Sequence, residues 1–355
     1  MEDHPDGRPV RPRARQLDLA FGELGTGPHN AITDVADVAV GHTTLRDDAA
    51  GLHSGVTAIS HPALAAGTPL PAGLFVGNGY GKLVGATQVV ELGLLETPVL
   101  LTSTLSTFRA ADALVTWVLE HHPGPPTSVN PVVGEINDSW LSSAVPRAVT
   151  AEHVHAALRA AGPGPVAMGN VGGGTGACAL GFKGGVGTAS RVLPGARGGT
   201  IGVIVQANMG GTLRLGGRLL RPGDLGLRAA GPVTAEAGSC VIVAAVDFPC
   251  SALDLARLAR RLVFGLGRTG ARFSHGSGDY GLAFSVVPGP PSEPLPPERL
   301  SAAFEAAMDC VEEAVVDALL AAHTVRTPDG RVAHALPAEA VRARGGGDPL
   351  GAGVR

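Results

Sequence analysis

Short apolar runs bounded by turn residues recur along the chain and predict a protein rich in β-strands. The run from Cys240 to Val246 has seven consecutive apolar residues, which is typical of a strand buried on both faces. Other valine-rich runs of strand length are bounded by Gly, Asn, Asp or Pro. These runs cover 37–45, 55–60, 73–79, 98–103, 164–172, 200–210 and 281–287.

Apolar residues at helical spacing predict several helices between and after these strands. The predicted helices are 106–122, a short one from Thr150 to about Gly162, 253–267, and a long one that contains 304–319. Ser251 and Asp254 form a capping box ahead of the third helix, and Pro123 stops the first. Many strands with helices outside them favour a layered α/β sandwich.

One domain is the better interpretation, because no linker of useful length divides the chain. We expect a catalytic domain at 17–342 between two flexible tails, residues 1–16 and 343–355. The proline-rich segment 288–299 reads as an exposed loop rather than as a domain boundary.

Composition and charge exclude several classes of partner. The chain of 355 residues is 45% hydrophobic and 16% charged, and its formal net charge of −4 does not favour nucleic acid. No apolar run reaches the roughly 18 residues that a membrane span needs, and the N-terminus lacks the apolar stretch of a secretory signal. The four cysteines lack metal or redox spacing. We therefore expect a cytoplasmic protein with buried thiols and no membrane contact.

Familiar catalytic motifs are missing from the chain. No serine is flanked as in the nucleophile elbow of α/β-hydrolases, G-x-S-x-G. Two glycine-rich stretches, 77–85 and 172–185, miss the spacing of phosphate-binding loops, and no histidine or cysteine has zinc-ligand spacing. We expect no cofactor and no metal.

A few small polar residues stand out inside glycine-rich or apolar surroundings. Asn208 ends an apolar run, and its amide could donate to a developing oxyanion. Ser277 and Asp279 are two apart, which places them on one face of an extended segment. Glu135 follows the apolar segment Pro131–Gly134. Taken singly, such residues more often belong to an ordinary turn or loop.

The pair Gly238–Ser239 precedes the most apolar run, with no general base near it in sequence. If the chain cuts itself between the two residues, Ser239 becomes an N-terminus. Its α-amino group, with a reference pKa of roughly 7.7–8.0, can then accept the hydroxyl proton. Glycine before the cut permits the strained backbone that exposes the carbonyl. A simple turn leading into a strand explains the same pair.

Six ordered blocks resemble the L-aminopeptidase/D-esterase (DmpA-like) family, which includes the β-aminopeptidases. The blocks are GNGYGKLVGATQVVELG, PVVGEINDSW, GNVGGGTGACALGFKGGVGTASR, VIVQANMG, GSCVIVAAVD and GRTGARFSHGSGD. The resemblance implies a four-layer αββα sandwich of N-terminal-nucleophile type. It also implies self-cleavage into an α chain, 1–238, and a β chain, 239–355, and a homo-oligomer of αβ units.

The resemblance also assigns roles to the residues singled out above. Ser239 matches the family nucleophile and Asn208 the oxyanion residue. Ser277 and Asp279 match the pair that hydrogen-bonds around the nucleophile and its amine. Glu135 matches the carboxylate that holds the substrate's free amino group. The implied activity is release of N-terminal amino acids, including D- or β-amino acids, from short peptides, amides or esters.

Three departures from the family pattern leave alternatives open. Val89 and Ser139 stand where relatives often have tryptophan and glycine, which bears on substrate preference. Cys240 follows the nucleophile, so a cut before Cys240 with a thiol nucleophile is an alternative. Other enzymes of the fold, amidases acting on nylon oligomers and acyl transferases, use threonine as the nucleophile, which Ser239 argues against. A protein that never cleaves and only binds is the remaining alternative.

Overall fold

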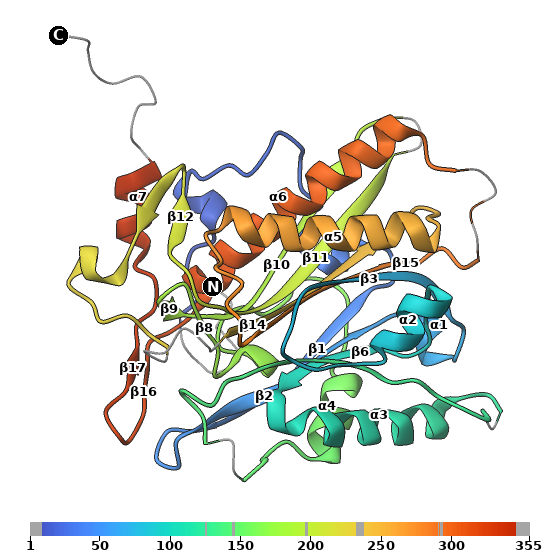
Figure 1. The fold of residues 1–355 in the computed structure, drawn as a ribbon, viewed down its shortest axis with the longest axis horizontal. Helices are drawn as coiled ribbons and strands as arrows, with labels where there is room; N and C mark the ends of the chain where they lie inside the picture. The colour runs from blue at the N-terminus through green and yellow to red at the C-terminus, as the bar shows by residue number, and fades with distance from the viewer. Residues whose placement is uncertain are drawn as a thin grey trace.

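Two β-sheets face each other in the centre of the molecule, and helices cover both outer faces (Figure 1). The structure is a computed structural model that describes residues 9–124, 126–143, 146–195, 198–231, 238–289, 291 and 294–345. The resulting layers follow the order helix, sheet, sheet, helix. This is the sandwich that the sequence predicted.

The larger sheet has six strands in the order β10-β11-β14-β15-β3-β5. These strands are β10 (Gly185–Leu193), β11 (Gly199–Asn208), β14 (Gly238–Val246), β15 (Ser277–Ser285), β3 (Leu70–Gly79) and β5 (Leu94–Leu95). Helices α5 (Ala252–Arg268) and α6 (Pro297–Ala321) pack on its outer face. Strand β14 is antiparallel to β11 and parallel to β15.

The smaller sheet has five strands in the order β1-β2-β6-β7-β4. These strands are β1 (Ala39–Asp47), β2 (Leu52–Ser60), β6 (Val99–Ser103), β7 (Val132–Ile136) and β4 (Leu83–Val84). Helices α3 (Thr107–His121) and α4 (Ala151–Arg159) cover its outer face at the opposite side of the molecule from α5 and α6 (Figure 1).

Shorter elements complete the described part of the chain. The helices are α1 (Pro62–Ala65), α2 (Ala86–Leu92) and α7 (Ala338–Gly345). The 3-10 turns are η1 (Ala14–Leu17), η2 (Ile32–Asp34), η3 (Thr104–Ser106), η4 (Gly172–Gly174) and η5 (Pro222–Leu225). The paired short strands are β8 (Cys178–Ala179) with β9 (Phe182–Lys183), β12 (Leu213–Leu215) with β13 (Arg218–Leu220), and β16 (Val325–Arg326) with β17 (Val332–Ala333). None of the helices described is long and apolar enough to cross a membrane.

Strand β14 explains the continuous apolar run seen in the sequence. Its residues alternate between two cores, because successive side chains of a strand point to opposite faces. Cys240, Ile242, Ala244 and Val246 lie in the core under α5 and α6, whereas Val241, Val243 and Ala245 lie between the sheets. The strand is buried on both faces, as predicted.

Most of the expected elements are present. Strands cover the predicted runs except 164–172, where the structure has an isolated bridge from Gly169 to Val186 and then η4. Helix α4 begins after Thr150, and Ser251 caps α5 by accepting from the Asp254 backbone N–H at 3.1 Å. Strands β7 and β10 were not predicted.

The prediction of a flexible tail at residues 1–16 is wrong for the part that the structure describes. Ala14 is fully buried, and the Arg13 Nε lies 2.7 Å from an Asp317 carboxylate oxygen on α6. Arg11 donates to the carbonyls of Ala322 and Leu336. These arginines satisfy buried acceptors, a role that a polar N-terminal stretch does not reveal in sequence. Residues 1–8 and 346–355 of the two expected tails lie outside the described residues.

Candidate active site

Ser239 lies at the start of the central strand β14, between strands β11 and β15. It pairs with Asn208 of β11 on one side and with Gly278 of β15 on the other. Only 3% of the residue is exposed. The Ser239 Oγ donates to the carbonyl oxygen of Gly238 at 2.6 Å and accepts from the Gly278 N–H at 3.3 Å. The hydroxyl is therefore held against the carbonyl of the residue before it.

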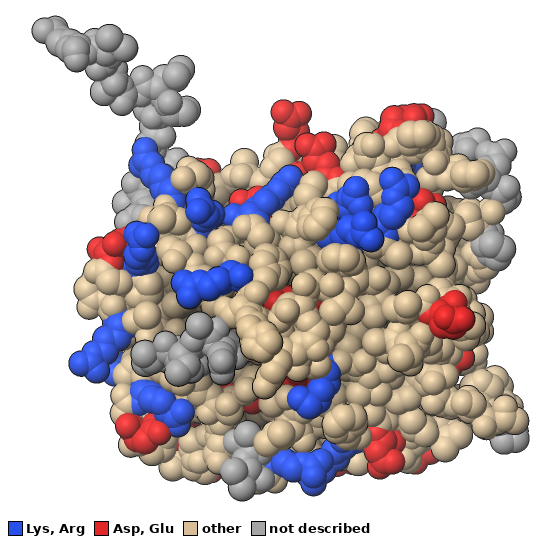
Figure 2. Space-filling model, in the orientation of Figure 1, with Lys and Arg blue, Asp and Glu red and all other residues tan. Residues whose placement is uncertain are grey.

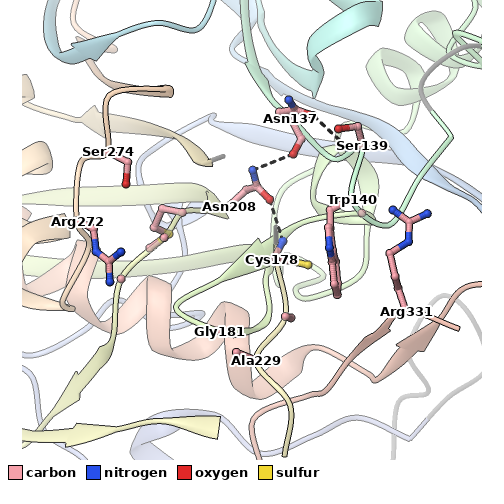
Figure 3. A pocket seen from close by; sticks show the side chains of 16 residues that line it. Asn137, Ser139, Trp140, Cys178, Gly181, Asn208, Ala229, Arg272, Ser274 and Arg331 are labelled. Carbon is pink, nitrogen blue, oxygen red and sulfur yellow. Dashed lines mark hydrogen bonds between the residues drawn. The ribbon is translucent and has the colours of Figure 1, made fainter. Parts of the chain in front are cut away.

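The side chain of Asn208 is fixed by two backbone groups (Figure 3). Its Oδ1 accepts from the Cys178 N–H at 2.9 Å, and its Nδ2 donates to the Asn137 carbonyl at 3.1 Å. These partners determine which end of the amide is nitrogen. Since an amide nitrogen carries two hydrogens, one remains to donate to an oxygen bound beside Ser239.

Ser277 and Asp279 lie beside the Gly238–Ser239 peptide bond but on the other face of the sheet. Tyr280 of β15 points into the core between the sheets, so the preceding residue Asp279, and Ser277 two residues before that, belong to the alternate face. The Ser277 Oγ lies 3.4 Å from the position that a Cβ on Gly238 would take. The Ser239 hydroxyl and this pair therefore approach the same peptide bond from opposite sides.

Asp279 is buried with half of its carboxylate unpaired. Its Oδ1 accepts from the Ser277 Oγ at 2.9 Å, whereas Oδ2 has no hydrogen-bond partner within the part of the chain described. Burial raises the pKa of Asp279 to about 6, against the hydrogen bonds from Ser277 and from the Cys240 backbone. A cation placed beside Oδ2 would satisfy this oxygen and favour the charged form.

Glu135 reaches the site from β7 of the smaller sheet. Its Oε1 accepts from the Lys82 N–H at 3.0 Å, and its buried Oε2 has no partner among the residues described. Burial raises the pKa of Glu135, opposed by the Lys82 amide and charge and by Thr104. A Cβ on Gly81 would stand 2.7 Å from Glu135 Oε1 and 3.0 Å from Gly278 Cα. Gly81 therefore lies between this carboxylate and the strand that contacts Ser239.

Asp138 fixes the loop that follows β7. Its carboxylate accepts from the Ser54 Oγ at 2.8 Å and from the Ser103 Oγ at 2.9 Å. Burial raises the pKa of Asp138 to about 6. The preceding residue, Asn137, supplies the carbonyl that accepts from the Asn208 side chain. By fixing this loop, Asp138 helps to position the Asn208 amide.

An open pocket of about 390 Å³ adjoins Asn208. Its wall contains the side chains of Asn137, Ser139, Trp140, Cys178, Arg272, Ser274 and Arg331, together with several glycines (Figure 3). Neither Ser239 nor Glu135 lines it. The Gly238–Ser239 peptide bond therefore lies beside the pocket, next to Asn208.

The alternative nucleophile Cys240 has different surroundings. Its side chain is fully buried in the core under α5 and α6, and burial raises the pKa of its thiol well above the ordinary value. No group of three His, Cys, Asp or Glu side chains suited to a metal ion occurs in the described ranges.

The structure thus brings together the five residues singled out in the sequence. Four flank one peptide bond, and Glu135 approaches from the facing sheet. Sequence reasoning missed the supporting groups: the Lys82 and Gly278 amides, the Asn137 carbonyl and the Cys178 amide. Backbone groups of this kind leave no signal in residue type, because any residue supplies them.

Comparisons with known proteins agree with this site and fold. Residues 30–333 match the model of peptidase family S58. The chain is 36% identical to β-peptidyl aminopeptidase BapA of Sphingosinicella microcystinivorans, over 94% of this chain and 91% of that protein. A Burkholderia sp. β-aminopeptidase structure has a TM-score of 0.85 at 37% identity, covering 95% of this chain and 100% of its own.

A second solved structure is similar to this chain and is described by its enzyme type and its fold. It is the L-aminopeptidase D-Ala-esterase/amidase of Ochrobactrum anthropi, with a TM-score of 0.83, 38% identity, and coverage of 94% of this chain and 97% of that one. That protein is described as a prototype for the serine aminopeptidases and as a new variant of the Ntn hydrolase fold. The predicted αββα fold of N-terminal-nucleophile type is confirmed.

Proposed function

This chain belongs to peptidase family S58 and is a hydrolase of the serine aminopeptidase type, and we propose that it activates itself by cutting between Gly238 and Ser239. The observation that carries the proposal is the Ser239 Oγ held 2.6 Å from the Gly238 carbonyl oxygen. The carbonyl carbon is one C=O bond from that oxygen, so Oγ lies close to the atom that it would attack. The enclosing strands keep the nucleophile and the bond together.

The proposed cut proceeds in two steps. Ser239 Oγ attacks the Gly238 carbonyl carbon, the C–N bond breaks, and the nitrogen takes the hydroxyl proton, which leaves an ester and a free amine. Water then hydrolyses the ester, giving a carboxyl terminus at Gly238 and restoring the Ser239 hydroxyl. The Asn208 amide stabilises the tetrahedral oxyanion in both steps.

After the cut, the new amine of Ser239 serves as the base for its own hydroxyl. Asp279 Oδ2, which has no hydrogen-bond partner among the described residues, lies on the face where this amine is released. The carboxylate and Ser277 then orient the amine and stabilise its protonated form. The mature Ser239 attacks a substrate carbonyl by the same route as it attacked Gly238.

The substrate's free amino group binds to Glu135. The unpaired Oε2 supports this role, because a substrate ammonium would complete its hydrogen bonding with a charge-assisted contact. The named relatives act on β-peptidyl groups or on L-aminoacyl groups and D-Ala esters and amides. We propose short peptides, amides or esters with a free α- or β-amino group as the substrates of this enzyme.

Intact mass under denaturing conditions tests the proposal, with a Ser239→Ala variant beside the unchanged chain. We expect two species, residues 1–238 and 239–355, from the unchanged chain and one uncut species from the variant. Turnover of an aminoacyl p-nitroanilide should appear only in the cleaved protein. The same substrate with an acetylated amino group should not be cleaved.

Other outcomes of the same experiment would replace the proposal. A split one residue later would make Cys240 the nucleophile, which its buried position argues against. A single uncut chain in both proteins would leave a protein that binds without cutting.

The cysteines and the surface of the molecule bear on where the enzyme acts and how it assembles. We propose that the enzyme acts in the cytoplasm, since its four cysteines are free thiols. We also propose an oligomer of αβ units, because large apolar side chains such as Val90, Leu92 and Leu253 are exposed by more than half. Size-exclusion chromatography with light scattering would measure the assembly.

A further inference from the structure

The pocket beside Asn208 has a definite place relative to the proposed substrate. Glu135 and its neighbour Gly81 do not line it, and they lie on the Gly278 side of Ser239. Asn208, on the other side of Ser239, forms part of its wall. The amino-binding carboxylate and the pocket therefore lie on opposite sides of the nucleophile.

This arrangement decides which part of a substrate enters the pocket. The inference rests on the proposed function, in which the amino group binds to Glu135 and the scissile carbonyl lies at Ser239. The leaving group is attached to the far side of that carbonyl, so it extends past Asn208 into the pocket. A volume of about 390 Å³ accommodates a small amino-acid leaving group.

The pocket is cationic although the molecule is not. Figure 2 shows basic and acidic side chains spread over one face, and the formal net charge is −4. Within the described lining of the pocket, however, the charged residues are Arg272 and Arg331, with no Asp or Glu. Figure 3 shows them on two sides of the pocket, with Asn208 and Cys178 between them.

The two arginines differ in what they already bind. Arg331 lies 2.7 Å from Asp329, which occupies its guanidinium. No ion pair or side-chain hydrogen bond occupies Arg272 in the described part of the chain. Its backbone is fixed, since the Arg272 N–H donates to the Gly210 carbonyl at 3.0 Å, two residues beyond Asn208. An unoccupied guanidinium is thus anchored close to the oxyanion residue.

We propose that Arg272 recognises a carboxylate on the leaving group, so that the enzyme prefers dipeptides and other acyl amino acids over neutral amides. A guanidinium fork binds a carboxylate through two parallel charge-assisted hydrogen bonds, which fixes the direction of the substrate. The carboxylate is either the α-carboxylate of the leaving amino acid or its acidic side chain. Arg272 is a specificity residue under this proposal and takes no part in bond cleavage.

Four substrates with one acyl group separate these sources. The acyl group is alanyl or β-alanyl, whichever is cleaved faster as the p-nitroanilide. It is joined to glycine, glycinamide, aspartic acid amide or asparagine amide, and kcat and KM are measured for each. The glycine pair tests the α-carboxylate, and the aspartyl and asparaginyl amides test the side-chain carboxylate.

In the Arg272→Ala enzyme we expect kcat/KM for the carboxylate-bearing substrate to fall about tenfold, mainly through KM. The neutral amides and the anilide should change less than twofold. Arg272→Lys should recover part of the loss, because it keeps the charge but not the fork. Arg331→Ala, which removes an arginine already paired with Asp329, is the matched control and should leave the acid preference intact.

Self-cleavage is read separately, by intact mass, and should be complete in all three variants. An enzyme that cuts itself and turns over the anilide but treats acid and amide alike overturns the pocket inference while leaving the proposed function in place. Equal losses on acids and amides in Arg272→Ala, or the acid-specific loss in Arg331→Ala, would also overturn it.

Discussion

A single amide, that of Asn208, connects Ser239, the pocket and the loop after β7. Its two fixed hydrogen bonds orient the remaining N–H before any substrate binds. Such preorganised donors are worth more than flexible ones, because no reorganisation accompanies charge development. The orientation of this residue should therefore matter more than its polarity alone.

Replacing Asn208 by alanine should lower kcat by about 10²–10³, the usual cost of losing one oxyanion donor. Self-cleavage should slow as well, which time-resolved denaturing gels would show. Asn137→Ala is the matched control, because Asn137 contacts Asn208 through its backbone carbonyl, which the change keeps. Near-normal turnover in Asn208→Ala would remove Asn208 from the oxyanion role.

Asp138 should make stability depend on pH. Burial raises its pKa to about 6 from an ordinary value of 3.8, so the folded state holds the proton more tightly than the unfolded state. Stability then decreases as pH rises from about 4 to 6, by about 3 kcal/mol for this group. The Asp138→Asn variant lacks this titration. Its free energy of unfolding should therefore increase relative to that of the parent as pH rises.

The measurement is urea unfolding at pH 4.5 and pH 7 in a Ser239→Ala background, where one uncut chain is expected. The advantage of Asp138→Asn should be larger at pH 7. Parallel stability changes in the two proteins across this range would show that Asp138 is not held protonated by its burial.

Residue type predicts some of this site and hides the rest. Glu135, Asn208, Ser277 and Asp279 could be picked out because polar side chains interrupt apolar or glycine-rich segments. Arg272 could not, because an arginine near a turn is usually solvated. The place of Arg272 near the site follows from the Gly211–Ala271 bridge, which brings Arg272 beside the segment that follows Asn208. This pairing is visible only in the structure.

At the scale of elements, close contact between helices and the larger sheet depends on glycines in the strands. A Cβ on Gly187 of β10 would stand 1.8 Å from the Ala314 carbonyl of α6. Gly73 of β3 and Gly281 of β15 face α5 in the same way, at 2.1 Å and 2.4 Å from its backbone. The helices therefore lie on the sheet backbone itself.

Gly187→Ala should destabilise the fold by about 3 kcal/mol, because the added methyl must push α6 away from the sheet. Gly25→Ala is the matched control, since nothing lies within 4 Å of its added Cβ. Urea unfolding of both variants in the uncut background would measure the difference. Equal stability of the two would mean that α6 shifts at little cost.

Strand β10 shows why some elements escape prediction. Its sequence mixes glycine with Thr188, Ser190 and Arg191, which breaks the apolar pattern of a buried strand. All three polar side chains are nevertheless buried, and each hydrogen-bonds to a partner elsewhere in the chain: the Val203 carbonyl, Asp34 and Glu313. The residues next to these positions in sequence cannot indicate hydrogen-bond partners so far away in the chain. The apolar runs of β11 and β14, by contrast, indicate a buried strand through their own residue types.

At the scale of the whole molecule, the proposed cut would divide a sheet without exposing it. Strands β14 and β15 belong to the β chain but lie between β11 and β3 of the α chain. Hydrogen bonds along both boundaries and the shared apolar cores would remain after the peptide bond is lost. We expect the two chains to stay together in native mass spectrometry and to separate only in denaturant.

A buried ionic cluster also joins the two segments that the proposed cut would separate. Glu313 of α6 lies 2.7 Å from Arg191 and 2.7 Å from Arg15, both of the α chain, and its pair with Arg191 is fully buried. Burial would raise the pKa of Glu313, but the Arg15 hydrogen bond and the Arg191 charge outweigh it and hold the pKa below its ordinary value. The cluster therefore stabilises the assembly above about pH 4.5 and loses this effect as pH falls.

Glu313→Gln should therefore weaken the association of the cleaved chains. Removing one partner leaves Arg191 buried without its counter-charge, a change that typically costs 3–5 kcal/mol. Chain separation in urea at pH 7 should occur at a clearly lower concentration than in the parent, and the difference should shrink in acid. Glu152→Gln, which breaks an exposed pair with Arg159, should cost about 0.5 kcal/mol or less. If the two variants separate alike at pH 7, the buried cluster contributes no more than a surface pair, and the strand hydrogen bonds and apolar cores hold the chains together.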